Sequence, residues 1–182
     1  MLSSTSNIFY NGLSITHICN PRLKNSYISI DKQANIVLKT PQVSSKFINT
    51  LLTDRESWIR KKIYHIESNP PIILTLDDID SIQSQEYLTQ KVEFFAKTMN
   101  LHYDELKFRK MKNRWGSCTN KGRITLNKKL IKTPEICIDY VVVHELAHLV
   151  HMNHSKEFHQ LVFNYLPHAE EAKRTLSRII FI

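Results

Sequence analysis

Residues 141–154 of the chain read VVVHELAHLVHMNH. Residues four apart on a helix lie on one face, about one turn from each other, so His144 and His148 can both direct a ring nitrogen at one cation. Glu145 lies at the edge of that face, where its carboxylate can reach a water molecule on the metal. This H-E-x-x-H arrangement is typical of two zinc ligands and a general base. The apolar residues around it indicate a helix buried in the core of a domain.

A catalytic zinc ion normally takes three protein ligands and leaves one position for water, so a third ligand is needed. On a continued helix, His154 would point away from the other two histidines. We predict that the helix ends near His151 and that Asn153 takes the left-handed conformation that asparagine tolerates. The chain then turns back and completes a metal site of His144, His148 and His154.

His151 is the competing third ligand, because it follows His148 by three residues on the same helical face. A helix would separate His144 and His151 by about 10 Å along its axis, which is too far for them to share one ion. His151 is therefore expected beside the site or in solvent. A distant carboxylate, such as Glu170 or Glu171, is the other alternative.

Hydrolysis of an amide bond is the natural chemistry of such a site. Zinc bound by three neutral imidazoles lowers the pKa of its water toward about 7, and Glu145 can take the proton of this metal-activated water and pass it to the leaving group. In zinc proteases an edge strand beside the metal helix often pairs with an extended substrate, and residues 124–127 are the candidate for that strand. Cys118 as a nucleophile is a weaker alternative, because nothing near it in the sequence lowers a thiol pKa.

Residues 1–66 are predicted to form a β-meander followed by a helix. Alternating apolar and polar residues indicate short strands between about residues 7 and 38. Apolar residues then recur at helical spacing, and Thr53 or Asp54 is the expected N-cap of a helix through about Ile66.

Residues 67–182 are predicted to place the metal helix beside a small antiparallel sheet, in an α+β fold. The two parts of the chain either fold separately or form one compact unit. The elements expected in the second part are a short strand at 72–76, a helix over 84–99, a strand at 106–111, a hairpin of 115–118 with 123–127, the metal helix over 134–151 with Thr133 as its N-cap, and a helix over 156–165 capped by Ser155.

The 182 residues carry a formal net charge of +8. This balance favours anionic partners, such as nucleic acid or acidic polypeptide, although a basic surface that only aids solubility would have the same composition. Three isolated cysteines indicate neither a disulfide framework nor a cysteine-based zinc site, and they fit a reducing cytoplasm. The sequence contains no secretion signal and no apolar run of the length that a membrane span needs. We therefore expect a cytoplasmic protein without a membrane partner, and no feature of the sequence indicates an oligomeric state.

Several motifs accompany the metal stretch: Arg114-Trp115-Gly116-Ser117-Cys118, Ile124-Thr125-Leu126-Asn127, Asp139-Tyr140 before residues 141–149, Asn153-His154-Ser155, and Phe158. In this combination they resemble the YgjP-like metallopeptidase family of bacterial proteins, which is itself similar to the SprT-like and WLM proteases. The resemblance covers about residues 85–176. It implies a zincin-like metallohydrolase domain over residues 67–182, a Zn²⁺ cofactor, the three histidine ligands and Glu145 as base. It also places residues 114–118 near the site, and Arg114 and Asn127 are the predicted substrate-binding residues.

The sequence is compatible with three functions. The leading one is a zinc metallopeptidase that acts on polypeptide. The second is a metal-dependent hydrolase of nucleotides or other phosphate-containing small molecules, because cations flank the presumed site at Arg109, Lys110, Lys112, Arg114 and Arg123. The third is a nucleic-acid-associated module whose metal is structural. A closed site with four protein ligands would favour the third, whereas three ligands and an open position favour an enzyme.

Overall fold

The computed structural model describes residues 3–77 and 79–182. The described residues fall into two compact units, with the boundary between Pro71 and Ile72. The residues up to Pro71 are called the N-terminal unit below, and those from Ile72 are called the C-terminal unit. None of the helices in the described ranges combines the length and the apolarity that a membrane crossing requires.

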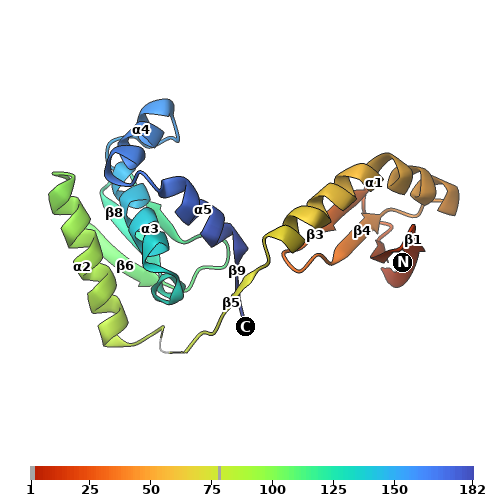
Figure 1. Ribbon diagram of the computed structural model, residues 1–182, viewed down its shortest axis with the longest axis horizontal. Helices are drawn as coiled ribbons and strands as arrows, with labels where there is room; N and C mark the ends of the chain where they lie inside the picture. Colours follow the sequence, from red (N-terminus) through yellow and green to blue (C-terminus); the bar gives the residue numbers. More distant parts are fainter. Residues whose placement is uncertain (1–2, 78) are drawn as a thin grey trace. The chain divides into compact units, whose positions relative to one another are not determined.

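The N-terminal unit is a four-stranded sheet with one long helix (Figure 1). Its strands are β1 (Ser4–Tyr10), β2 (Leu13–Cys19), β3 (Tyr27–Ile30) and β4 (Ile36–Thr40), in the order β1-β2-β4-β3. The β1–β2 and β3–β4 pairs are antiparallel, whereas β2 and β4 are parallel. The sheet therefore differs from a simple meander. The parallel pairing sets Ile15 opposite Ile36, so that both side chains enter the core.

Helix α1 (Ser45–Ser68) packs on this sheet through the buried residues Ile48, Leu52 and Ile59. The hydroxyl of Ser44 caps the helix by accepting a hydrogen bond from the backbone N–H of Phe47. The predicted N-cap at Thr53 or Asp54 is wrong, because the helix begins more than two turns earlier. Thr53 instead donates its hydroxyl to the carbonyl of Asn49 inside the helix.

The C-terminal unit is built on a three-stranded sheet of β6 (Glu105–Arg109), β7 (Gly116–Cys118) and β8 (Arg123–Asn127). The predicted hairpin of β7 and β8 is confirmed, and Gly122 closes its turn with a φ of 69°, a value that favours glycine. β6 pairs with β8 in parallel, so the sheet is mixed and not antiparallel throughout.

Helix α3 (Glu135–Ala147) runs through the middle of the C-terminal unit, between α2 (Ile82–Thr98) and α5 (Ala169–Arg178) (Figure 1). It contacts both of these helices, as well as α4 (Lys156–Tyr165) and the sheet, and most of its side chains are buried. A short strand, β5 (Ile72–Leu74), confirms the predicted strand after the prolines, and it pairs in parallel with β9 (Ile179–Phe181).

The predicted N-cap of α3 is also wrong. Thr133 donates its hydroxyl to the carbonyl of Leu130 and thereby ends a preceding 3₁₀-helix (Lys128–Lys132), while α3 begins after Pro134. The acidic residue Glu135 does stand in the first turn, where the helix dipole favours a negative charge.

Lys91 joins α2 to α3 through the carboxylates of Glu135 and Asp139, and its nitrogen is 2.9 Å from the latter. Burial opposes the charge of Lys91, but the two carboxylates outweigh it and raise the pKa of the ammonium. The side chains of Lys91 and Asp139 are 18% and 21% exposed, so this pair is screened less than a surface pair.

We predict that Lys91→Met lowers the free energy of unfolding by about 1–2 kcal/mol, between the values for exposed and buried pairs. The raised pKa of Lys91 keeps its contribution present at every pH below about 10, and the lowered pKa of Glu135 keeps that carboxylate charged above about pH 4. Chemical denaturation should thus give a constant difference from the wild type between about pH 6 and about pH 9, which shrinks in acid. Lys107→Met, which breaks a more exposed pair with Glu105, is the control and should change stability little. An equal loss in both variants would contradict the prediction.

Candidate metal centre

His144 and His148 come from the end of α3. His144 lies in the last turn of the helix and His148 is its C-cap residue. Their ring centroids are 4.9 Å apart, and the rings meet edge to face at 83°. The spacing of four residues therefore places both imidazoles on one side of the helix end, as the sequence predicts.

His154 reaches the same point from the segment between α3 and α4. Its ring centroid is 5.0 Å from that of His144 and 4.8 Å from that of His148. The Nε2 atoms of His144 and His154 are 3.0 Å apart. One nitrogen from each of the three rings lies within 4.8 Å of the other two, which is a group that could hold a metal ion. These three histidines are called the His triad below.

The turn that delivers His154 differs from the predicted one. Among the described residues, positive φ values outside glycine occur only at Asn11, Ala34 and Asn100, so the left-handed conformation predicted for Asn153 is wrong. The helix ends at Ala147, earlier than His151, and the backbone N–H groups of Leu149 and Val150 bond three residues back to Leu146 and Ala147. This tighter winding ends the helix without a left-handed residue.

Ser155 then starts α4, as predicted. Its hydroxyl accepts a hydrogen bond from the backbone N–H of Phe158 at 3.3 Å. The cap fixes where α4 begins, and so it limits the segment that carries His154 to the few residues between the two helices.

His151 contributes to the site through its backbone. Its carbonyl oxygen is 3.0 Å from Nδ1 of His148. A carbonyl can only accept, so this contact places the proton of His148 on Nδ1 and leaves a lone pair on Nε2 for a metal. The sequence placed the His151 side chain beside the site or in solvent, but no sequence signal points to its carbonyl.

Burial keeps two rings of the triad, those of His144 and His154, uncharged. It lowers the pKa of His144 to about 4, with added repulsion from His148 and His154, and it also lowers the pKa of His154. Nδ1 of His144 is buried and has no hydrogen-bond partner among the described residues. Both rings are therefore neutral at neutral pH, which is the form of histidine that binds a metal.

The ring of Phe158 contacts all three histidines of the triad. Its side chain is fully buried, and its ring centroid lies 4.9, 4.6 and 4.8 Å from those of His144, His148 and His154. A rigid ring in contact with all three imidazoles restricts their rotation. The sequence contains Phe158 as part of a motif, but its contact with every ligand candidate follows only from the packing of α4 against α3.

Glu145 packs directly against Gly116 of β7. A β-carbon at position 116 would lie 2.5 Å from Oε1 of Glu145, so only glycine leaves room for this carboxylate. Glu145 is 6% exposed. Burial raises the pKa of its carboxyl group to about 8, and the positive charge of Arg114 opposes that rise. The group is thus an acid–base group that titrates near neutral pH.

Arg114 and Asn127 occupy different environments. Arg114 is exposed, and its charge acts on Glu145. Asn127 is 3% exposed, and its Nδ2 donates to the carbonyls of Met111 and Arg114, while its Oδ1 accepts from the N–H groups of Met111 and Lys129. Three of these four hydrogen bonds hold residues 111–114 in place, and the fourth caps the 3₁₀-helix at Lys129.

The strand predicted to pair with a substrate is not an edge strand. Residues 124–127 belong to β8, which is paired with β6 on one side and with β7 on the other. That expectation is wrong, because hydrophobic alternation marks a strand but not its place in the sheet. The edge strand that contacts α3 is β7.

Cys118 lies at the end of β7 and is partly buried. Burial, and then the nearby charge of Glu145, raises the pKa of its thiol to about 11. Thiolate is therefore scarce at neutral pH, and this environment argues against Cys118 as a nucleophile.

Comparisons with known proteins identify a family for the C-terminal unit. A family profile described as YgjP-like, metallopeptidase domain, matches residues 72–179, which is more than half of the chain. A search of curated proteins finds no match. Among solved structures, the metallopeptidase zymogen of Pyrococcus abyssi abylysin is 24% identical and has a TM-score of 0.46, over 49% of this chain and 90% of its own. The metallopeptidase zymogen of Methanocaldococcus jannaschii jannalysin is 21% identical with a TM-score of 0.44, over 49% and 92%. On the strength of the family match, the chain belongs to the YgjP-like metallopeptidase domain family.

Proposed function

We propose that the C-terminal unit is a zinc-dependent peptidase in which the His triad holds the metal and Glu145 is the general base. The observation that carries the proposal is the meeting of three imidazoles close to a buried carboxylate, Glu145, on the helix that supplies His144. Membership of a metallopeptidase family supports a polypeptide as the substrate.

The donor set suits zinc. Three imidazole nitrogens leave one coordination position open, which is the arrangement of catalytic and not structural zinc sites. The Nε2 atoms of His144 and His154 are 3.0 Å apart, and one nitrogen of each of the three rings lies within 4.8 Å of the other two, so these residues would hold the ion together. The proton of His148 already lies on Nδ1, away from the metal.

A zinc ion held by these nitrogens would polarise a peptide carbonyl and lower the pKa of a water molecule. Glu145 would accept a proton from the attacking water and donate it to the departing amine. A carboxyl group with a pKa of about 8 holds that proton well at neutral pH. Arg114 limits the rise in pKa, so that a useful fraction of the carboxylate stays ionised.

The edge of β7 offers a place for an extended substrate. Within the described strands, β7 is hydrogen-bonded only to β8, so its other edge can accept main-chain hydrogen bonds from a peptide. Arg114 precedes this strand and is exposed, and we propose that it contacts the substrate. For Asn127 we propose a positioning role through the 111–114 segment in place of direct substrate contact.

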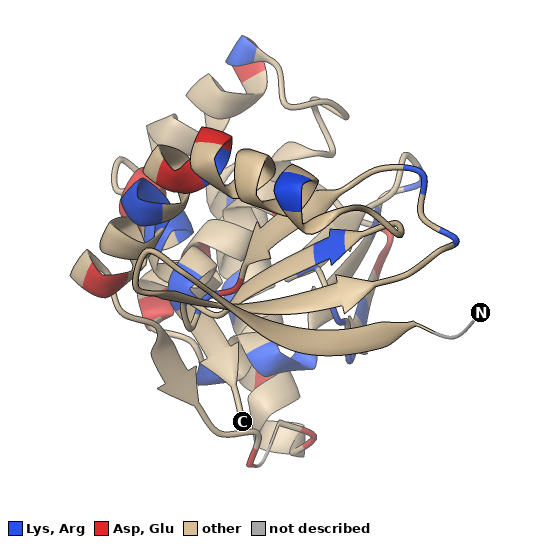
Figure 2. Cartoon of the chain, turned by 90° about the vertical axis from the view of Figure 1, so that its right-hand side faces the viewer, with Lys and Arg blue, Asp and Glu red and all other residues tan. Residues whose placement is uncertain are grey.

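The family match favours the peptidase over the two alternative functions. Two of the five cations predicted to bind phosphate form salt bridges with carboxylates of the chain, Lys110 with Asp80 and Arg123 with Glu105. Figure 2 shows Lys and Arg on helices, strands and loops, interspersed with Asp and Glu.

We predict that His154→Ala lowers the affinity for zinc by more than about 100-fold, because even outer partners of metal ligands are worth about 10- to 100-fold. Competition with a chromogenic chelator would measure this affinity. His159→Ala is the matched control: His159 stacks on His154 with a centroid separation of 6.2 Å but lies outside the triad. Unchanged affinity in His154→Ala would contradict the ligand set and point to His151, or to a carboxylate such as Glu170.

Glu145→Gln should leave the zinc content unchanged and lower kcat by about 10²- to 10⁴-fold, the usual contribution of general acid–base catalysis. The assay is the cleavage of a fluorescently labelled unstructured polypeptide by the zinc-loaded protein. Glu86→Gln, which changes an exposed carboxylate on α2, should retain full activity. Turnover that survives in Glu145→Gln would show that another group is the base.

Gly116→Ala should displace the Glu145 carboxylate, because the added methyl group would occupy its position. A displacement of about 1 Å can cost about 100-fold in rate, so we expect a loss of kcat of that order with zinc still bound. Ser117→Ala, at the next position of β7, is the control. Thermal unfolding of both variants would separate a displaced base from a general loss of stability. Normal activity in Gly116→Ala would mean that the position of Glu145 does not matter to the reaction.

A further inference from the structure

A cavity of about 310 Å³ is lined by residues of α3, α4 and α5, and His144 is one of them. Because His144 belongs to the triad, the cavity directly adjoins the candidate metal centre. A peptide with its scissile bond at the metal would therefore have a neighbouring residue within reach of this cavity.

One wall of the cavity is apolar. Phe158 and Val162 are buried behind it, and Phe163 borders it with 55% of its surface exposed. An exposed phenylalanine next to a cavity offers contact area to the methylene groups of an incoming side chain. The wall thus suits a residue with an aliphatic stem.

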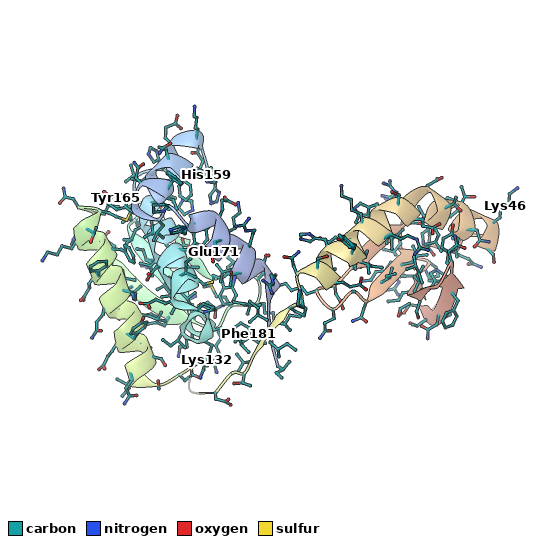
Figure 3. The ribbon with its side chains drawn as sticks, viewed as in Figure 1. Lys46, Lys132, His159, Tyr165, Glu171 and Phe181 are labelled. Carbon is teal, nitrogen blue, oxygen red and sulfur yellow. The ribbon has the colours of Figure 1, made fainter. Side chains whose placement is uncertain are left out.

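The lining of the cavity also contains basic residues. Lys156 at the start of α4 and Lys173 on α5 both border it, together with His159, which is labelled in Figure 3. Glu170 is the only carboxylate among the lining residues, and it pairs with Lys173 at 3.6 Å. Lys156 makes no ion pair within the described part of the chain. The lining therefore keeps an excess of positive charge.

Lys173 borders the same cavity as His144, one of the three candidate metal ligands. The Glu170–Lys173 pair is largely exposed, with side chains 78% and 58% accessible, so an incoming anion can compete with Glu170.

We propose that this cavity is a subsite for a carboxylate-bearing residue next to the scissile peptide bond, held by Lys156 and Lys173 with its stem against Phe163. The carboxylate belongs either to an aspartate or glutamate side chain or to a free chain terminus. The inference rests on the proposed peptidase function and adds a substrate class to it.

The test begins with a peptide whose cleaved bond has been mapped by mass spectrometry. The residue on each side of that bond is replaced in turn by glutamate, glutamine and lysine, and kcat/KM is measured with the zinc-loaded full chain. On one side of the bond, glutamate should exceed glutamine by about three- to tenfold, as expected for one or two partly exposed ion pairs. Equal values for glutamate and glutamine on both sides would overturn the proposal.

Variants in the cavity should change this preference in opposite directions. The double variant Lys156→Glu with Lys173→Glu should invert it toward lysine, whereas Glu170→Gln should increase the preference for glutamate by releasing Lys173. The control Lys46→Glu with Lys97→Glu makes the same change in net charge on exposed positions of α1 and α2, and it should leave the preference unaltered. An unchanged preference in the double cavity variant would overturn the assignment of these lysines.

Amidated and free peptides separate the two sources of the carboxylate. If an internal glutamate accelerates cleavage of an amidated peptide, the side chain occupies the cavity. If acceleration requires a free C-terminus close to the bond, the chain terminus occupies it. Either result supports the subsite, and indifference to both carboxylates overturns it.

A binding measurement keeps the subsite separate from the peptidase proposal. N-acetylglutamate methylamide is titrated into the zinc-loaded Glu145→Gln variant, and backbone amide resonances are followed by NMR. Shifts on α4 and α5 that are several-fold weaker with the glutamine analogue support the subsite even if no peptide is cleaved. The absence of shifts there, or equal binding of the two analogues, overturns the subsite even if peptides are cleaved.

Discussion

The contact between Glu145 and Gly116 is the constraint on which the candidate site depends. It brings a charged side chain of α3 against the backbone of β7 so closely that a single methyl group would not fit. Other helices cover the remaining sides of α3. The contact between Glu145 and Gly116 therefore fixes the distance between α3 and the sheet. It also buries the carboxylate, and burial raises its pKa to about 8. One packing contact thus sets both the position and the proton affinity of the proposed base.

The His triad depends on the same helix, but through its repeat and its end and not through a packing contact with the sheet. His144 and His148 are placed by the helix repeat, whereas His154 is placed by the point at which the helix stops. The stop is made by tight backbone hydrogen bonds at Leu149 and Val150 and by the cap at Ser155. Phe158 then supports all three rings from the start of α4. The site is therefore assembled from short-range backbone geometry and one shared aromatic contact.

Features that depend on near neighbours in the sequence could be predicted. The four-residue spacing of His144 and His148, the β7–β8 hairpin and the Ser155 cap are local, and each appears as expected. The return of His154 to the site was also expected, although through the wrong conformation of Asn153. The sequence indicates that a turn is needed between His148 and His154, but the packing of α4 against α3 decides which backbone conformation this turn takes.

Features that depend on distant partners could not be predicted in the same way. Alternating residues mark β8 as a strand, but its central position follows from pairing with β6, which lies beyond a long connection. The parallel pairing of β2 with β4 is of the same kind. The clash that excludes a side chain at position 116, and the carbonyl of His151 on His148, exist only once separate segments have packed.

The pairing of β5 with β9 closes the C-terminal unit on itself, because these are its first and last strands. The closing strand also contacts residues near β7: the ring of Phe181 lies 5.8 Å from that of Trp115, the residue before Gly116, and Nζ of Lys129 lies 5.0 Å from the centroid of the Phe181 ring. The contact between Phe181 and Trp115 therefore links the strand pair that closes the unit to the segment leading into β7, so a disturbance of the closing pair would be felt at the strand beside the proposed base.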